Sequence, residues 1–250
     1  MFRYRGEIVS ESRPHLHPME FVRGYSKKDD GSMYLSANGF DPENVSNRRR
    51  FFSTEGHDGM PVIAAGLIHG TAISVVDLKS PVYISETDAL VTDKPGILLS
   101  LTGADCFPVF FEDPYAGNIG ICHAGWRGIL GGIVPGTAEA LHTLGSDTKH
   151  IAVHIGSGIC ADHFEIGPDV VPFFESYKEA IHHIGTGDDK KILVDLKRII
   201  RRQLTDTGIT EDHISDANEC TYCLEETYYS FRRDHPDTPQ TQVAYIGMRA

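Results

Sequence analysis

Three segments that lie far apart in the sequence each carry a side chain of the kind that binds metal ions. His69 follows an apolar run and precedes Gly70. Cys106 ends the polar turn Gly-Ala-Asp-Cys, and His123 lies in a stretch with three glycines between residues 120 and 128. Two imidazoles and one thiolate suit zinc with a fourth position open to water or substrate, as in a catalytic site. Buried or otherwise satisfied side chains are the alternative, because ligands so far apart obey no spacing rule.

Two charged residues adjoin these candidate ligands. Asp105 directly precedes Cys106 and could act as a general base, as a hydrogen-bond partner of a ligand, as an acceptor for substrate, or as a plain turn carboxylate. Arg127 lies at the expected start of a helix, where the helix dipole and the guanidinium together favour an anion such as phosphate. In the alternative interpretation, Trp126 anchors the core and Arg127 pairs with a surface carboxylate.

Other clusters are weaker candidates for chemistry. Arg48 lies in a run of three arginines at 48–50, for which a solvated helix face is the simpler explanation, and the pair at 232–233 has the same ambiguity. Cys220 and Cys223 form a C-x-x-C, but we find neither a second pair nor an adjacent histidine to complete a four-ligand zinc site. We therefore interpret that pair as buried or incidental, and His163 as structural or exposed.

The pattern of apolar residues predicts the elements that must position these groups. Short apolar runs bounded by turn residues predict strands at 62–67, 72–76, 97–101, 107–111, 118–122, 151–155 and 242–246. Helical spacing predicts helices at 134–144, 173–181 and 192–204. Many short strands with few helices indicate an α/β protein of the α+β kind, in which helices flank a mixed sheet. No linker divides the chain, so we expect one domain over residues 1–250.

Bulk composition excludes several classes of function. The chain has 250 residues and a formal charge of -12, which argues against general binding to nucleic acid or to anionic membranes. No apolar stretch approaches the ~20 residues that a membrane span needs, and the N-terminal residues contain no apolar signal core. Five cysteines without a secretory signal predict free thiols. We therefore expect a cytoplasmic enzyme, and the sequence leaves its oligomeric state open.

The order of the motifs is itself informative. The segments His-Gly at 69–70, Ala-Asp-Cys-Phe-Pro-Val at 104–109 and His-Ala-Gly-Trp-Arg-Gly at 123–128 resemble those of the YfiH-like laccase-domain family, which is also called multicopper polyphenol oxidase. The resemblance spans nearly the whole chain. Further matching segments are 24–26, 42–50, 156–159, 164–167, 220–222 and 229–234.

The resemblance implies a fold similar to the catalytic domain of cytotoxic necrotising factors, with zinc held by His69, Cys106 and His123. It implies a purine nucleoside phosphorylase that uses inorganic phosphate, deaminates adenosine and cleaves methylthioadenosine. Asp105 and Arg48 are then the expected catalytic residues, and Arg127 the expected substrate-binding residue. Copper in place of zinc, with oxidation of phenols, and peptidoglycan editing are also attached to the family.

Three other functions stay open. Cys106 could be the nucleophile of a metal-free cysteine hydrolase, with His123 as its base. A multicopper oxidase would need a richer set of histidine ligands than this sequence offers at one place. A zinc ion with all four positions closed would indicate a partner-binding module in which the metal only supports folding.

Overall fold

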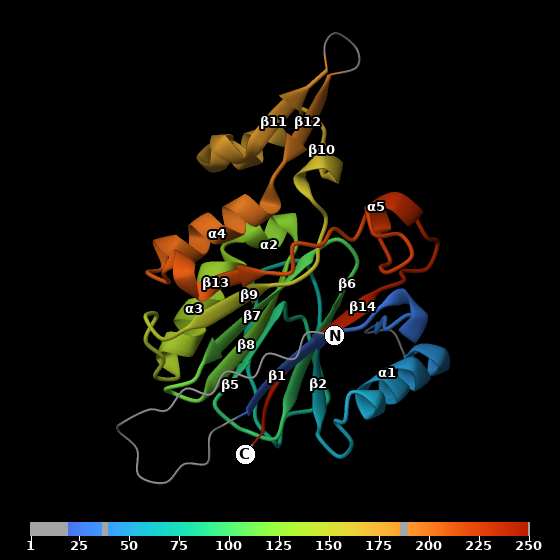
Figure 1. Cartoon of the computed structure of the whole chain (residues 1–250), viewed down its shortest axis with the longest axis vertical. Helices are drawn as coiled ribbons and strands as arrows, with labels where there is room; N and C mark the ends of the chain where they lie inside the picture. The colour runs from blue at the N-terminus through green and yellow to red at the C-terminus, as the bar shows by residue number, and fades with distance from the viewer. Residues whose placement is uncertain (1–19, 37–39, 186–189, 250) are drawn as a thin grey trace.

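Two β-sheets packed face to face lie at the centre of the molecule (Figure 1). The computed structural model describes residues 20–36, 40–185 and 190–249. The five-stranded sheet has the order β1 (Glu20–Tyr25), β14 (Gln242–Arg249), β6 (Leu98–Gly103), β2 (Val62–Gly66), β4 (Tyr83–Ser85). The six-stranded sheet has the order β13 (Ile214–Asp216), β9 (Ala152–Ile155), β7 (Phe107–Asp113), β8 (Asn118–Ala124), β5 (Ala89–Thr92), β3 (Ile73–Val75). Both sheets combine parallel and antiparallel neighbours.

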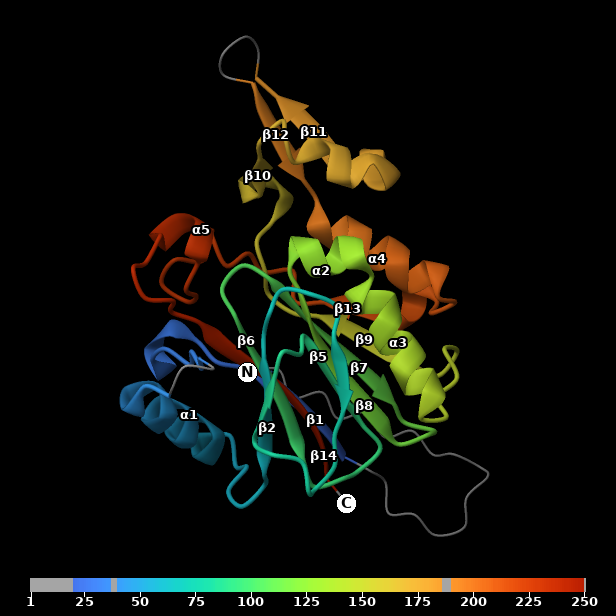
Figure 2. The same ribbon diagram turned by 180° about the vertical axis from the view of Figure 1, so that it is seen from behind.

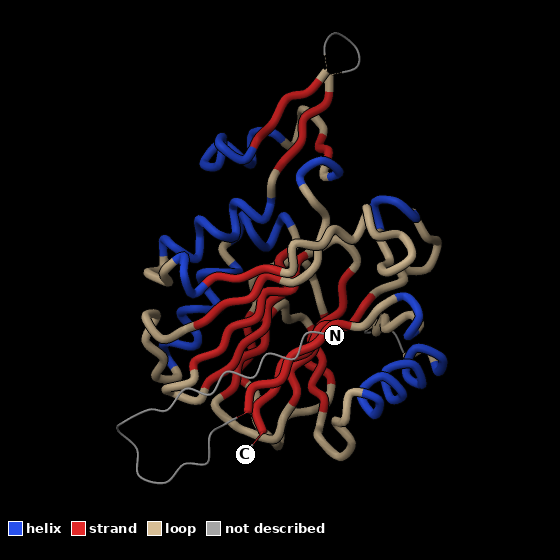
Figure 3. Tube along the Cα trace, viewed as in Figure 1, coloured by secondary structure: helices blue, strands red, loops and turns tan. Residues whose placement is uncertain are grey.

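Helices cover the outer faces of the two sheets. Helix α1 (Pro42–Thr54) lies against the five-stranded sheet, whereas α2 (Trp126–Gly131), α3 (Ile133–Thr143) and α4 (Leu196–Asp206) lie on the side of the six-stranded sheet (Figure 2). A smaller antiparallel sheet of β10 (Glu165–Ile166), β12 (Lys191–Val194) and β11 (Ile181–Ile184) projects from one end (Figure 3). Shorter helices are η1 (Lys28–Asp30), η2 (Ala161–His163), η3 (Val171–Ala180), η5 (Glu211–His213) and α5 (Phe231–Asp234).

Side-chain alternation along the strands builds a separate apolar cluster between each pair of layers. In β14, Val243 and Tyr245 face α1, whereas Ala244 and Ile246 face the other sheet. The six-stranded sheet contributes side chains such as Phe110 to the apolar cluster between the two sheets. Burial of apolar surface at three interfaces therefore fixes the order helix, sheet, sheet, helix.

The predicted mixed α/β class is confirmed, and each predicted strand overlaps an observed one. The helix predicted at 134–144 is α3. The prediction for 192–204 is wrong in its first part, since residues 191–194 form β12. Asp195 explains the boundary, because its carboxylate accepts a hydrogen bond from the Arg198 backbone N–H at 3.0 Å and starts α4 at Leu196.

Two further predictions needed correction. Residues 173–181 lie mainly in the 3-10 helix η3, which passes directly into β11. The sequence predicted one mixed sheet, whereas the strands of the described residues form three sheets. Among the described helices, none combines the length and the apolar character that a membrane span requires.

A partly buried cluster of ion pairs connects α4 to β13, the edge strand of the six-stranded sheet. Asp216 accepts hydrogen bonds from Lys197 Nζ at 3.1 Å and from Arg201 Nη2 at 2.6 Å, and its side chain is only 16% exposed. Burial alone would raise the pKa of Asp216, but these cations hold that pKa below its ordinary value. A carboxylate whose pKa is lower in the folded state stabilises the fold at pH values above its unfolded-state pKa. This stabilisation is lost as the pH falls through the folded-state pKa.

We expect Asp216→Asn to lower the free energy of unfolding by about 1–2 kcal/mol at pH 7, because the charge-assisted bonds to α4 are lost. Urea unfolding of both proteins from pH 7 down to about pH 2 checks this. The difference should persist down to about pH 4 and shrink below it, as the wild-type carboxylate becomes protonated. The exposed neighbour Asp212→Asn is the matched control. A difference that stays constant below the pKa of Asp216 would contradict this interpretation.

Candidate metal centre

The structure brings together the three side chains that the sequence singled out as metal ligands. His69, Cys106 and His123 each offer one ligand atom, and these atoms all lie within 4.8 Å of one another. The two imidazole rings are nearly perpendicular, at 87°, with centroids 4.8 Å apart. His123 is 2% exposed, whereas His69 is exposed to solvent. One side of the cluster is therefore open to an incoming molecule.

The path of the chain between the two sheets explains why the ligands meet. Residues 67–72 lead from β2 in the five-stranded sheet to β3 in the six-stranded sheet, and residues 104–106 lead from β6 to β7 in the same direction. His123 lies near the end of β8, opposite Pro108 at the beginning of β7. The two connections between the sheets and the end of β8 thus place all three ligands at the same end of the double sheet.

Asp88, which the sequence did not single out, connects two of the ligands. Its side chain is fully buried, and its two carboxylate oxygens accept hydrogen bonds from the backbone N–H groups of His69 and Gly70, each at 2.8 Å. His123 Nδ1 lies 3.4 Å from Asp88 Oδ1 and has no closer polar partner among the described atoms. The nitrogen that remains for a metal ion is Nε2, and a carboxylate behind a histidine ligand is the usual means of orienting it.

Electrostatics favour the ligand form of the thiol. Burial alone would raise the pKa of Cys106, but the charge of His123 and hydrogen bonds from both imidazoles hold that pKa below its ordinary value. Burial would likewise lower the pKa of His123, yet the Cys106 thiolate and Asp88 hold it above its ordinary value. The side chains therefore stabilise a thiolate, which is the form of cysteine that binds zinc and also the form that attacks as a nucleophile.

Gly125 supplies a test of whether a bound ion fits. A Cβ atom built on Gly125 would lie 3.0 Å from Cys106 Sγ and 3.4 Å from His123 Cε1, so a larger residue would crowd the ligands. The close approach depends on α2, where a Cβ on Gly128 would lie 2.9 Å from the Gly70 carbonyl oxygen. The thiolate, the two imidazoles and the cleared space beside them fit a four-coordinate ion with one open position.

Asp105 lies beside this cluster, but its carboxylate is already engaged. Oδ1 accepts a hydrogen bond from the Thr221 hydroxyl, and Oδ2 accepts one from the Arg232 backbone N–H, both at 2.7 Å. Its own carbonyl oxygen accepts from the Ile159 N–H at 2.8 Å. The backbone φ of Asp105 is 87°, a region that residues other than glycine rarely adopt. These bonds hold the strained turn that presents Cys106.

The two predicted anion-binding arginines have different surroundings. Arg127 is exposed, and its guanidinium lies 4.3 Å from the Trp126 ring centroid, two residues beyond Gly125. Arg48 is 8% exposed and donates to Ser100 Oγ at 3.0 Å and to the Met33 carbonyl oxygen at 3.4 Å. Burial lowers the pKa of Arg48 to about 10, and among the described residues no carboxylate forms an ion pair with it.

Tyr25 is a second residue that sequence reasoning missed, although residues 24–26 belong to the matching segments. Its hydroxyl lies 3.5 Å from the Ser157 carbonyl oxygen. Burial, and then the neighbouring Tyr228, Asp105 and Cys106, raise the pKa of Tyr25 above its ordinary range. The phenol therefore keeps its proton and donates a hydrogen bond to the Ser157 carbonyl oxygen, close enough to Cys106 for the two groups to interact electrostatically.

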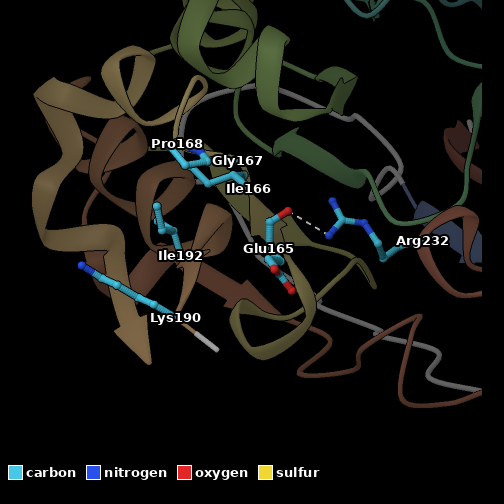
Figure 4. Close-up of a pocket in the computed structure, with 7 residues that line it drawn as sticks. All are labelled: Glu165, Ile166, Gly167, Pro168, Lys190, Ile192 and Arg232. Atoms are coloured by element: carbon cyan, nitrogen blue, oxygen red, sulfur yellow. Dashed lines mark hydrogen bonds between the residues drawn. The ribbon is translucent and has the colours of Figure 1, made fainter. Parts of the chain in front are cut away.

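A pocket of ≈ 340 Å³ lies beside β10 and β12, and none of the three candidate ligands lines it (Figure 4). Arg232 reaches one side of it, where Nη1 donates to the Glu165 carbonyl oxygen at 2.9 Å. The same residue donates its backbone N–H to Asp105. The pocket is therefore adjacent in structure to the turn before Cys106 but separate from the ligand cluster.

The chain is similar to a known protein family, to named relatives and to a solved structure. Residues 22–249 match the family described as multi-copper polyphenol oxidoreductase laccase. The chain is 34% identical over 214 residues to a purine nucleoside phosphorylase of Deinococcus radiodurans, which covers 83% of this chain and 79% of the relative. It is 33% identical over 181 residues to an adenosine deaminase from an unknown prokaryotic organism, which covers 66% of this chain and 67% of the relative. The crystal structure of YlmD from Geobacillus stearothermophilus has a TM-score of 0.82 at 29% identity and 92% coverage of both chains.

We expect Asp88→Asn to weaken metal binding by about 10–100-fold, because an amide nitrogen cannot accept a hydrogen bond from the 69–70 turn and the negative charge behind His123 is lost. Competition with a chelator of known affinity measures the change. The exposed carboxylate Asp93, replaced as Asp93→Asn, is the control that should leave the affinity unchanged. An Asp88→Asn protein that is folded, by its thermal unfolding curve, and binds the metal as tightly as the wild type would refute the orienting role.

Proposed function

The chain belongs to the multi-copper polyphenol oxidoreductase laccase family, and from this premise we propose that it is a zinc-dependent purine nucleoside phosphorylase. Adenosine deamination and methylthioadenosine phosphorolysis are proposed as further activities of the same site. One observation carries the proposal: the ligand atoms of His69, Cys106 and His123 lie within 4.8 Å of one another with one side open to solvent. The names of the relatives supply the class of substrate.

His69, Cys106 and His123 would hold the ion. When bound, zinc supplies a Lewis acid at the open side of the cluster. Copper also accepts imidazole and thiolate ligands, so the native metal has to be measured. Asp88 keeps the His123 ring oriented, and the neighbouring imidazole of His123 keeps the Cys106 thiol ionised before the metal arrives.

In phosphorolysis, a phosphate oxygen forms a bond to C1′ of the ribose while the bond from C1′ to the purine nitrogen breaks. The electron pair leaves with the base, which gains a proton. Positive charge develops on the ribose, and an adjacent phosphate stabilises it and attacks it. Arg48 and Arg127 are the proposed phosphate ligands. Arg48 is the stronger candidate, because its buried charge meets only neutral oxygens and its partner Ser100 lies in β6, the strand that leads to Cys106.

In deamination, water adds to the purine carbon that bears the amino group, and ammonia leaves. Asp105 was expected to move the protons. One hydrogen bond to each of its carboxylate oxygens, from Thr221 and from the Arg232 backbone, ties the side chain in place, although each oxygen keeps a second lone pair. We therefore propose that Asp105 acts mainly as a positioning residue that holds the turn bearing Cys106.

A metal-free cysteine hydrolase is the second candidate, and the ionised pair of Cys106 and His123 favours it. In that mechanism the thiolate attacks a carbonyl carbon and His123 protonates the leaving group. The metal content of the active protein separates the two functions. A hydrolase of this kind is active without any bound ion, and thiol alkylation abolishes its activity.

The proposed function is tested by incubating the zinc-loaded protein with adenosine and phosphate. We expect adenine and ribose 1-phosphate, with inosine from deamination. Cys106→Ser should lower both rates by at least about 100-fold, since one ligand is lost. Cys122→Ala is the matched control, because Cys122 points into the core beneath the α2–α4 layer. If a fully zinc-loaded protein yields none of these products, the proposed function is wrong.

Arg48→Gln should raise the KM for phosphate by about 10–100-fold, the effect of losing hydrogen bonds to a charged ligand. Initial rates at varied phosphate and saturating adenosine give this value. Arg49→Gln, on the exposed side of the same helix, should leave it unchanged. If only Arg127→Gln raises the phosphate KM, the phosphate site belongs to Arg127 instead.

A further inference from the structure

A second group of sulfur and nitrogen ligands lies apart from the first. Cys160, His163, Cys220 and Cys223 each offer one ligand atom, and these atoms all lie within 4.8 Å of one another. The sequence showed no partners to complete a four-ligand site around the C-x-x-C, whereas the fold places Cys160 and His163 beside it. The missing partners are separated from the C-x-x-C by about sixty residues of sequence, so only the fold brings them to it.

Two short turns face each other and supply two ligands each. Cys160 precedes η2 and His163 ends it, so the two side chains lie on one side of a single 3-10 turn. Cys220 and Cys223 have the same spacing, and their turn is closed by the Leu224 N–H donating to the Cys220 carbonyl oxygen at 3.0 Å. The pattern is that of structural zinc sites, in which pairs of ligands are separated by two residues.

The contacts inside the group are close to those between the ligands of a bound zinc ion. His163 Nδ1 lies 3.1 Å from Cys160 Sγ and 3.5 Å from Cys223 Sγ. Tetrahedral zinc with its usual bond lengths separates neighbouring ligand atoms by roughly 3.4–3.8 Å. The Cys160 backbone N–H donates to Cys220 Sγ at 3.2 Å, and such a bond stabilises a thiolate.

We propose that Cys160, His163, Cys220 and Cys223 form a second metal site, which binds one zinc ion with all four positions closed by protein. Four protein ligands leave no position for substrate, so the site is structural and distinct from the open cluster of His69, Cys106 and His123. Three thiolates and a neutral imidazole leave one net negative charge around a divalent ion.

The surroundings of the site match this charge and hold its ligands in place. The His163 ring stacks on Tyr222, with centroids 4.0 Å apart and planes at 15°, which leaves Nδ1 directed at the sulfurs. Arg233 Nη1 donates to the carbonyl oxygens of Thr221 and Tyr222, both at 2.8 Å, directly behind the C-x-x-C. Arg232 Nη1 donates to the His163 carbonyl oxygen at 3.3 Å. The charge of Arg233 is paired with the Asp234 carboxylate, so Arg233 supports the backbone of the C-x-x-C, and Arg232 is the cation that lies beside the anionic metal site.

The second site is coupled by structure to the first. Thr221 lies between two of the proposed ligands, and its hydroxyl donates to Asp105, which precedes Cys106. Cys220 also pairs with Gly158 in a short β-bridge beside the Asp105 carbonyl contact at Ile159. An ion that fixes the C-x-x-C turn would therefore also fix the anchor of the turn that presents Cys106.

Metal analysis of the purified full chain tests the proposal. We expect about two zinc ions per chain in the wild type and about one in each of Cys106→Ser, Cys160→Ser and Cys223→Ser. Cys122→Ala should keep two, since Cys122 belongs to neither group. Retention of both ions in a folded Cys223→Ser and a folded Cys160→Ser would overturn the second site.

Metal binding by the Cys106→Ser protein tests the second site without altering its ligands, so the test does not depend on whether the other variants fold. In this background the remaining zinc should be released by titration with an organomercurial, which caps thiolates. After replacement with cobalt, the same protein should show strong thiolate-to-metal absorption from three sulfurs. If Cys106→Ser binds no metal, or if mapping of the native protein finds a disulfide among Cys160, Cys220 and Cys223, the proposal is wrong. Neither result bears on the nucleoside assay, so the second site and the proposed function fail independently.

Discussion

The carboxylate of Asp88 receives two backbone N–H groups from the 69–70 turn and lies against the imidazole of His123. It is fully buried, so its charge has no water to compensate it and depends on these donors. The pKa of Asp88 stays below its ordinary value for the same reason, although burial alone would raise it. A turn from one sheet and a strand of the other are therefore held at a fixed separation, and the remaining parts of the metal centre are built around that separation.

The double sheet makes this arrangement possible. Each sheet alone would expose an apolar face, and the packing of the two faces obliges the chain to cross from one sheet to the other. The crossings at 67–72 and 104–106 occur at the same end, where they bring His69 and Cys106 to the end of β8. Polar ligands are thus gathered at the rim of an apolar interface, where their desolvation strengthens interactions with a bound ion.

Local pattern in the sequence was sufficient for most strands of the core, because short apolar runs with bounding turn residues report on burial, but it missed the buried strand β5. It was also sufficient to single out His69, Cys106 and His123 as candidates, because their residue types restrict the chemistry. Asp88 and Tyr25 could not be found in this way, since their importance depends on contacts across strands that only pairing in the fold creates. The same limitation applies to His163, whose partners in the C-x-x-C lie far away in sequence, and to 191–194, where tertiary pairing overrides helical spacing.

We propose that one metal ion binds between His69, Cys106 and His123 and retains an open coordination position. Anomalous diffraction from crystals of the purified protein, measured on both sides of the zinc absorption edge, tests it most directly. We expect an anomalous peak about 2.0–2.1 Å from one nitrogen of each imidazole and about 2.3 Å from the Cys106 sulfur, with no fourth protein ligand. The absence of a peak at that point in zinc-supplemented crystals, or a fourth side chain bound to the ion, would contradict it.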